Sequence, residues 1–336
     1  MFSRKSHMLA SPSPTIQETV PQFVMASVVV CMQLVSAASA TEPPMTAVAF
    51  APDGQTVVGV SQAGLQEFSW PELKRQRTIE VAAANLHGLA FSADGRHLAV
   101  GGGNPAEKGV VEAFTWPEAR SIATFVEHED SVRDVAWIDS TGIVSASLDR
   151  ELLLWEFQGT ASASVQAYSG HSRGVSCVLP IEDGAMVVTG GDDQSVRVWE
   201  VASGKLIRSL NQHTKPVQSL ALRPSAAALP MVASAAGDRT IKFWQPTIGR
   251  MVRYVRLDSV PLCIAWVDED RIAAACVDGR VRIVDANEVR VSQDLDGIDG
   301  WAYALAVHPV ENSIVVGGSD GQLRTVELKD ANQATK

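Results

Sequence analysis

The chain has 336 residues, of which 46% are hydrophobic and 20% are charged, with 25 glycines and 16 prolines. This composition supplies enough apolar side chains for a substantial core and many turn residues, and it excludes a largely disordered chain. The formal net charge of −10 argues against sequence-independent binding of DNA or RNA, which requires an excess of lysine and arginine.

The first 40 residues have the features of a secretion signal. A basic segment precedes the uncharged stretch from 23 to 35, and the small-x-small motif of a signal-peptidase site ends at Ala40. The apolar stretch is too short for a transmembrane helix, which needs about 20 residues. We therefore predict cleavage after Ala40 and a mature chain that begins at Thr41 in the periplasm or outside the cell, without a transmembrane span.

An Asp residue that stands six positions before a Trp residue recurs through the middle of the chain. Two further Asp residues continue the series, although Val284 and Val326 stand where the Trp would be. The full series is Asp149 with Trp155, Asp193 with Trp199, Asp238 with Trp244, and then Asp278 and Asp320. Successive Asp residues are 40 to 45 positions apart, which indicates a structural repeat.

Each repeat contains the pattern of a small antiparallel sheet. In the fourth unit, short alternating segments run over 175–180, 185–190, 195–200 and 206–210, with turn residues between them. Such a sheet cannot bury both faces alone, but radial packing around an axis buries them against neighbouring sheets. We therefore predict an all-β fold, a seven-bladed β-propeller of four-stranded antiparallel blades. The predicted blades span about 44–85, 86–130, 131–173, 174–215, 216–259, 260–300 and 301–329, and a flexible tail follows at 330–336.

The recurring residues resemble those of the WD-repeat β-propeller family. The Trp-Asp pair of that family stands here as Trp-Glu at 155–156 and 199–200 and as Trp-Gln at 244–245. The first two units keep Trp70 and Trp116 but lack the Asp and a preceding His. With the leader, the resemblance favours a bacterial member of the family that is secreted.

The resemblance implies a buried chain of hydrogen bonds in units three to five. In each set Asp accepts from His, His pairs with a hydroxyl group, and the hydroxyl accepts from the indole N–H. The sets are His128, Ser145, Asp149 and Trp155; His171, Thr189, Asp193 and Trp199; and His213, Ser234, Asp238 and Trp244. Asp278 and Asp320 are expected in the equivalent turns of the last two units. These residues therefore have a structural role.

Ser, His and Asp are also the members of a hydrolytic triad. Here the set occurs three times with a Trp, and each hydroxyl is expected in mid-strand instead of on a G-x-S-x-G elbow. The sequence contains no metal-ligand spacing, phosphate loop or dinucleotide fingerprint. We therefore predict no catalytic residue, no metal and no cofactor. The alternative is a periplasmic propeller enzyme or cofactor binder of the lactonase or quinoprotein kind.

The resemblance places partner binding on the face formed by the Asp turns and the loops that enter each first strand. We predict a non-catalytic scaffold that binds protein or peptide partners there, binds no nucleic acid and is monomeric by itself. Trp301 and Tyr303 are the leading candidates because exposed aromatic residues often anchor partners, although packing between blades is an alternative. The other candidates are Glu129, Asp130, Arg133, Arg150, Ser172, Arg173, Asp192, Lys215, Arg239 and Arg280. Three of the arginines, at positions 150, 239 and 280, could form a partly basic ring, for which a solvated face is the alternative.

Two questions remain open at this point. Cys263 and Cys276 are expected on adjacent strands, so a disulfide between them is an alternative to free thiols. The last blade also needs a fourth strand, which WD-repeat proteins commonly supply from the N-terminus, here the segment 28–37. One segment cannot be both a cleaved signal and a closing strand, so an intact leader would instead indicate a cytoplasmic protein.

Overall fold

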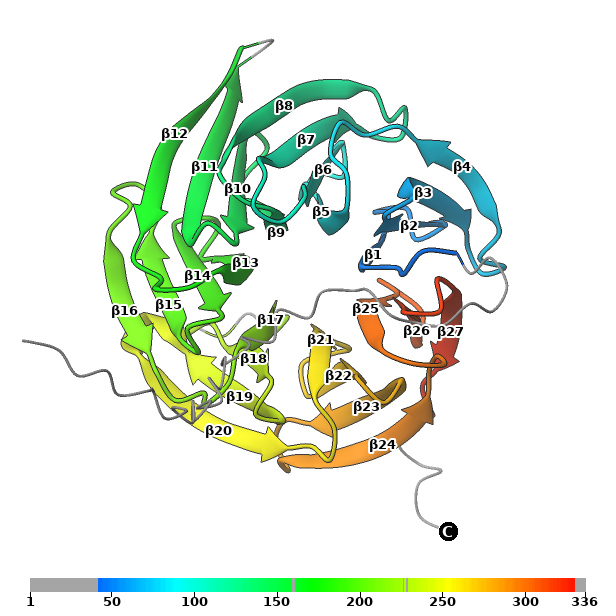
Figure 1. The fold of residues 1–336 in the computed structure, drawn as a ribbon. Helices are drawn as coiled ribbons and strands as arrows, with labels where there is room; N and C mark the ends of the chain where they lie inside the picture. Colours follow the sequence, from blue (N-terminus) through cyan, green and yellow to red (C-terminus); the bar gives the residue numbers. More distant parts are fainter. Residues whose placement is uncertain (1–41, 159–160, 226, 228, 330–336) are drawn as a thin grey trace, which may run out of the picture. The chain divides into compact units, whose positions relative to one another are not determined.

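Short segments of alternating polar and apolar residues form 27 strands in a computed structural model that describes residues 42–329, apart from 159–160, 226 and 228. The strands form seven antiparallel sheets, or blades, arranged in a ring around a central axis (Figure 1). This arrangement confirms the predicted seven-bladed β-propeller. In the fourth blade, the observed strands agree with the predicted segments to within one residue at each end.

The first four blades contain four strands each, in the order of the sequence from the axis outward. Blade 1 is β1 (Ala47–Phe50), β2 (Thr56–Ser61), β3 (Gly64–Ser69) and β4 (Arg75–Ile79). Blade 2 is β5 (Leu86–Phe91), β6 (His97–Gly102), β7 (Gly109–Thr115) and β8 (Ser121–His128). Blade 3 is β9 (Val132–Trp137), β10 (Gly142–Ser147), β11 (Glu151–Gln158) and β12 (Ala161–Ser169). Blade 4 is β13 (Val175–Ile181), β14 (Met186–Gly191), β15 (Val196–Glu200) and β16 (Leu206–Leu210).

The remaining blades follow the same order. Blade 5 is β17 (Val217–Leu222), β18 (Val232–Ala236), β19 (Thr240–Gln245) and β20 (Arg250–Arg256), with the 3-10 helix η1 (Pro246–Ile248) before β20. Blade 6 is β21 (Pro261–Trp266), β22 (Arg271–Cys276), β23 (Arg280–Asp285) and β24 (Arg290–Asp296). Blade 7 is β25 (Ala302–Val307), β26 (Ser313–Gly318) and β27 (Leu323–Glu327), so its sheet has three strands among the described residues.

The ring closes where the first strand meets the last blade. Strand β1 contacts both β5 and β25, and these innermost strands surround the axis in Figure 1. Just before β1, the backbone N–H of Met45 donates to the carbonyl oxygen of Gly318 at 3.0 Å. The predicted signal at 1–40, the alternative closing strand at 28–37 and the predicted tail at 330–336 lie outside the described residues.

The hydrophobic core lies between neighbouring blades. One cluster joins Val188 and Val198 of blade 4 to Val217 and Trp244 of blade 5, and similar clusters occupy the other interfaces. The second strands are almost completely buried because each blade is covered on both faces. This packing supplies the stability that an isolated four-stranded sheet would lack.

Small residues allow close approach of blades near the axis. A Cβ atom added at Gly88 of blade 2 would lie 2.7 Å from the Cα atom of Asp134 in blade 3. A Cβ atom added at Gly101 would lie 2.6 Å from Cγ1 of Val132. Glycine at these positions therefore sets how closely blades 2 and 3 can pack.

Candidate functional site

The three predicted sets of polar residues are brought together, beginning with blade 3. Nδ1 of His128 lies 2.7 Å from Oδ2 of Asp149, and Nε2 of the same ring lies 2.7 Å from Oγ of Ser145. The indole N–H of Trp155 donates to that hydroxyl oxygen at 2.7 Å. Because a carboxylate can only accept, Nδ1–H donates to Asp149, and when the ring is neutral Nε2 accepts from the Ser145 hydroxyl.

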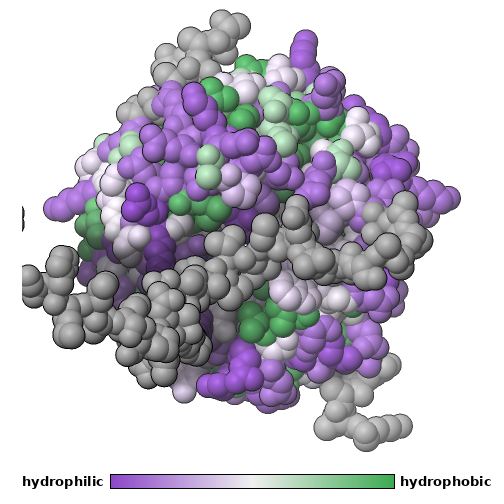
Figure 2. All heavy atoms as spheres, viewed as in Figure 1, coloured by the Kyte–Doolittle hydropathy of each residue, from purple (hydrophilic) through white to green (hydrophobic). Residues whose placement is uncertain are grey.

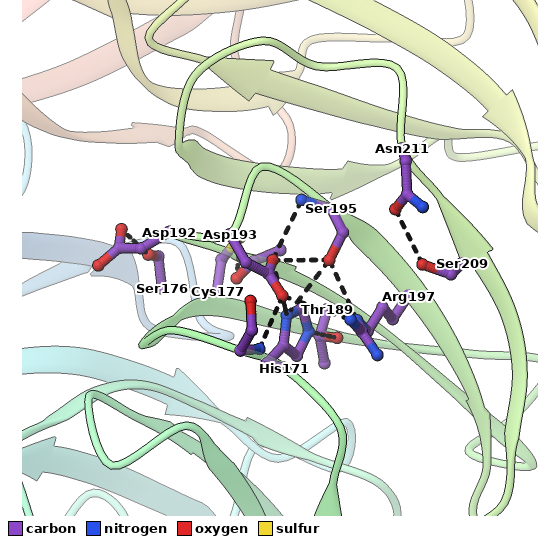
Figure 3. A network of polar contacts seen from close by, with 12 residues as sticks. His171, Ser176, Cys177, Thr189, Asp192, Asp193, Ser195, Arg197, Ser209 and Asn211 are labelled. Atoms are coloured by element: carbon purple, nitrogen blue, oxygen red, sulfur yellow. Dashed lines mark hydrogen bonds and ion pairs between the residues drawn. The ribbon is translucent and has the colours of Figure 1, made fainter.

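Blade 4 repeats this arrangement, and Figure 3 shows its His171, Thr189 and Asp193 side chains together. Nδ1 of His171 lies 3.0 Å from both carboxylate oxygens of Asp193, and Nε2 lies 2.8 Å from Oγ1 of Thr189. The indole N–H of Trp199 donates to Oγ1 of Thr189 at 2.9 Å. The Ser195 hydroxyl adds a hydrogen bond of 2.6 Å to Asp193.

Blade 5 contains the third set. Nδ1 of His213 lies 2.9 Å from Oδ2 of Asp238, and Nε2 lies 2.7 Å from Oγ of Ser234. The indole N–H of Trp244 donates to the same hydroxyl at 2.7 Å. The Thr240 hydroxyl donates to Asp238 at 2.6 Å, in the place that Ser195 occupies in blade 4.

Each set connects two neighbouring blades. His128 is the last residue of β8 in blade 2, whereas its partners Ser145, Asp149 and Trp155 belong to blade 3. The two other histidines likewise follow the outer strand of the preceding blade. The hydrogen bonds therefore fix the connection from each outer strand to the next blade.

The electrostatics of the three carboxylates fit a structural role. Burial opposes their ionisation, but hydrogen bonds from His128 and backbone N–H groups lower the pKa of Asp149 below its ordinary value. The pKa of Asp193 and that of Asp238 are lowered in the same way. Burial lowers the pKa of His213, although its hydrogen bond to Asp238 acts against this effect. The neutral imidazole is thus the favoured form of His213.

The hydroxyl groups of these sets are placed where no substrate can reach them. Ser145, Thr189 and Ser234 are each 0% exposed, and each already accepts from an indole. A serine nucleophile needs an exposed oxygen beside its base. The geometry therefore gives these residues a stabilising role and no nucleophilic one.

In blades 6 and 7 the turn Asp is bound by an Arg of the third strand instead of by a His. Both guanidinium Nη atoms of Arg282 donate to Asp278, at 2.7 and 3.0 Å, and Arg324 donates to Asp320 at 3.0 Å. Arg197 of blade 4 makes a similar contact with Asp193 at 3.4 Å. The sequence prediction missed this role, although a basic residue stands four positions after the turn Asp in blades 4 to 7, whereas Leu153 stands there in blade 3.

The predicted aromatic pair, Trp301 and Tyr303, lies at the start of β25, the first strand of blade 7. Trp301 is 42% exposed, and its ring centroid lies 6.0 Å from that of Tyr303 in an edge-to-face arrangement. Burial raises the pKa of the half-buried Tyr303. The backbone N–H of Trp301 is held by the Ser319 hydroxyl at 2.8 Å. Trp301 therefore presents an aromatic surface to solvent, and its backbone is anchored by Ser319.

The predicted basic ring is incomplete. Arg150 and Arg239 are exposed, but Arg280 donates to Asp294 at 2.7 Å and to Asp296 at 2.5 Å. Arg280 therefore contributes no unpaired positive charge. The other candidates of this face, at positions 129, 130, 133, 172, 173, 192 and 215, are exposed or half-buried.

The inner strands place the predicted candidate Arg133 beside two polar residues, His87 and Asp134, that the sequence analysis did not single out. Arg133 precedes Asp134 at a bulge in β9, and Nη1 of Arg133 lies 3.3 Å from Nδ1 of His87. Asp134 accepts from the backbone N–H groups of Val135 and Val178, both at 2.9 Å. The surrounding protein nevertheless raises the pKa of Asp134 to about 7, mainly by desolvation.

The described cysteines are free thiols, so no disulfide joins Cys263 to Cys276. The bulge between β21 and β22 pairs Cys263 with Ala275, whereas Cys276 pairs with Pro261. Cys276 packs in the cluster shared with blade 5, and Cys263 packs toward blade 7. The two sulfur atoms therefore face different interfaces, and burial raises the pKa of each thiol to about 11.

Two kinds of feature are absent from the described residues. No group of three or more His, Cys, Asp or Glu side chains is arranged to hold a metal ion within them. In the same part of the chain, no helix is long and apolar enough to cross a membrane.

Comparison with known proteins agrees with this geometry. The family model "WD domain, G-beta repeat" matches residues 119–156, 162–200 and 204–245. Each matched segment begins near the outer strand of one blade and ends with the third strand of the next. The matched unit therefore spans the same junction that the His, Asp and Trp residues connect.

Curated relatives are similar at low identity. The methylosome protein WDR77 of Xenopus laevis is 28% identical over 61% of this chain and 66% of its own length. The nuclear distribution proteins nudF of Aspergillus niger and PAC1 of Coccidioides posadasii are 24% and 26% identical over 64% and 63% of this chain. The match covers 44% and 41% of those two proteins, so this chain spans less than two thirds of the relatives' lengths. These relatives are eukaryotic. The chain thus carries WD40 repeats within a seven-bladed β-propeller.

Proposed function

We propose that this protein is a non-catalytic scaffold that binds protein partners on the face carrying the Asp turns. The observation that supports it best is Trp301, a large aromatic residue that is 42% exposed and whose backbone N–H donates to the Ser319 hydroxyl. Rigid aromatic side chains are common anchors at interfaces because they bury much area at little entropic cost. The similarity to WD-repeat proteins supports the same function.

The character of the visible surface agrees with selective docking. Hydrophilic residues predominate on the face seen in Figure 2, and hydrophobic residues form small separate patches. Large contiguous apolar patches mark obligate interfaces. A partner that binds to a surface of this character would rely on a few anchors with polar contacts around them.

Partner capture by a Trp301→Ala variant tests the proposal. The tagged protein is incubated with an extract of its own cells, and bound proteins are identified by mass spectrometry. Val310→Ala is the matched control, because Val310 is 90% exposed and follows the opposite end of β25. Loss of the same partners in Trp301→Ala alone is the expected result. Identical partners in both variants would exclude this surface.

We also propose that the mature chain begins at Thr41, outside the cytoplasm of a bacterial cell. The basic segment, the apolar stretch and the motif ending at Ala40 support this compartment. The closing contact made by Met45 lies beyond the proposed cleavage site, so a cleaved chain retains it. Amino-terminal sequencing of protein from its own cells tests the proposal, and an intact leader in a cytoplasmic fraction would contradict it.

A further inference from the structure

A cationic pocket of about 550 Å³ lies in blade 5 on the face that carries the Asp turns. Lys215 enters it from the loop before β17, Arg239 from the turn before β19, and Lys242, Tyr254 and Arg256 from β19 and β20. One carboxylate, that of Asp238, also lines the pocket. Four cations and one carboxylate make it positive on a protein with a net charge of −10.

Within the described part of the chain, three of the four cations of this pocket lack carboxylate partners of the kind that Arg280 has in blade 6. Among the residues that the structure describes, Lys215, Arg239 and Arg256 have no side-chain hydrogen bond or ion pair. Asp238 is engaged by His213 and Thr240, and the ammonium of Lys242 donates to the carbonyl oxygen of Gln212. The pocket therefore has positive charge that the fold does not neutralise.

Blade 6 shows how the same positions are neutralised. In β23 and β24, Arg280 pairs with Asp296 and Arg282 pairs with Asp294 in the strand register. Arg280 forms ion pairs with both aspartates, and Arg282 lies 3.8 Å from Asp294.

In blade 5 the corresponding pairs are Thr240 with Arg256 and Lys242 with Tyr254. Arg256 and Tyr254 thus stand where blade 6 has its two carboxylates. Tyr254, which is 53% exposed, adds an aromatic surface at the same place.

We propose that this cationic pocket binds an acidic segment of a partner protein, in an extended conformation with carboxylates at alternate positions. Alternate residues of an extended chain face the same side, and blade 6 places Asp294 and Asp296 in that way. A short acidic segment would supply, from one side of its extended backbone, the carboxylates that blade 5 lacks. This inference rests on the scaffold function and names the chemistry of its partner.

The test uses a fluorescein-labelled peptide with the sequence of residues 290–297, RVSQDLDG, and fluorescence anisotropy. A matched peptide carries Asp294→Asn and Asp296→Asn. We expect the full-length protein to bind the Asp peptide about tenfold more tightly than the Asn peptide, since a charge-assisted hydrogen bond contributes about that factor. Binding should weaken when the ionic strength is raised, because salt screens exposed charges.

Two variants and a control locate the binding site. Arg256→Gln should weaken binding of the Asp peptide about tenfold. Tyr254→Asp with Arg256→Asp, which gives blade 5 the carboxylates of blade 6, should abolish binding without unfolding the protein. Arg250→Gln is the control, because Arg250 is exposed on the same strand but outside the pocket.

The outcomes separate this proposal from the scaffold function. Equal binding of the Asp and Asn peptides, or no effect of Arg256→Gln, would overturn the acidic-segment proposal. Binding only of a peptide with phosphoserine in place of the aspartates would also overturn it. Trp301→Ala should bind the peptide normally; if partner capture depends on Trp301 but the peptide does not bind, the pocket proposal alone fails.

Discussion

Met45 and Gly318 join the two ends of the ring through a backbone hydrogen bond of 3.0 Å. The Met45 side chain is 3% exposed and packs with Val57 and Phe68 of blade 1 and with Ala304 and Val315 of blade 7. Residues just before β1 therefore contribute to closure through both a hydrogen bond and apolar packing.

Met45→Ala should lower the free energy of unfolding by about 2–5 kcal/mol, as is usual when a buried Met side chain is truncated. The change leaves the backbone hydrogen bond to Gly318 in place, so it measures the packing part of closure. Urea denaturation followed by tryptophan fluorescence provides the measurement. Leu222→Ala, at a residue that is 37% exposed, is the control. Equal losses in the two variants would show that Met45 has no special part in closure.

Thr189→Val should destabilise the protein although it preserves the size of the side chain. The variant leaves the indole N–H of Trp199 and Nε2 of His171 buried without their shared partner. Each unsatisfied buried group costs about 1–3 kcal/mol, so we expect a loss of about 2–5 kcal/mol. The melting temperature and denaturant midpoint report the change, and Thr78→Val at an exposed position of β4 is the control. A loss no larger than that of the control would mean that the hydroxyl is dispensable.

Acid should destabilise the fold in two ranges of pH. Burial lowers the pKa of His213 below 6.5, so the unfolded chain binds a proton there before the folded chain does, and stability falls as the pH drops below about 6.5. The lowered pKa values of Asp149, Asp193 and Asp238 act in the same direction below about 4.

Thermal denaturation between pH 8 and pH 3 measures this dependence. Asp193→Asn removes one of the three carboxylates, so its melting temperature should fall less steeply than that of the wild type below about pH 4. The variant should keep the decline near pH 6 that His213 causes. An unchanged slope in the acidic range would exclude Asp193 as a contributor.

The sequence predicted the blades because the same landmarks recur at nearly constant intervals. Asp193 and Trp199 mark the turn and third strand of a blade, and equivalent residues mark its neighbours. The hydrogen bonds of His171 could also be anticipated, since a His, a hydroxyl, an Asp and a Trp recur together. Because these residues recur, both the fold and its internal hydrogen bonds could be predicted from the sequence.

The charge balance of single blades could not be predicted in the same way. Whether Arg280 is neutralised depends on Asp294 and Asp296, which lie across a strand pair whose register contains a bulge. A similar bulge separates Cys263 from Cys276. Alternation alone does not locate bulges, and a one-residue shift moves a side chain to the other face of the sheet.

The glycines between blades 2 and 3 determine an angle as well as a distance. Each blade acts as a wedge, and in a closed ring the angles between the seven wedges must complete one full turn. Gly88 and Gly101 keep the inner side of one wedge narrow, because an added methyl group would contact Asp134 or Val132. A larger side chain there would separate the two blades on their inner side and reduce that angle, and the six other interfaces would have to open in compensation. The residues beside the axis therefore select the number of blades for the whole ring.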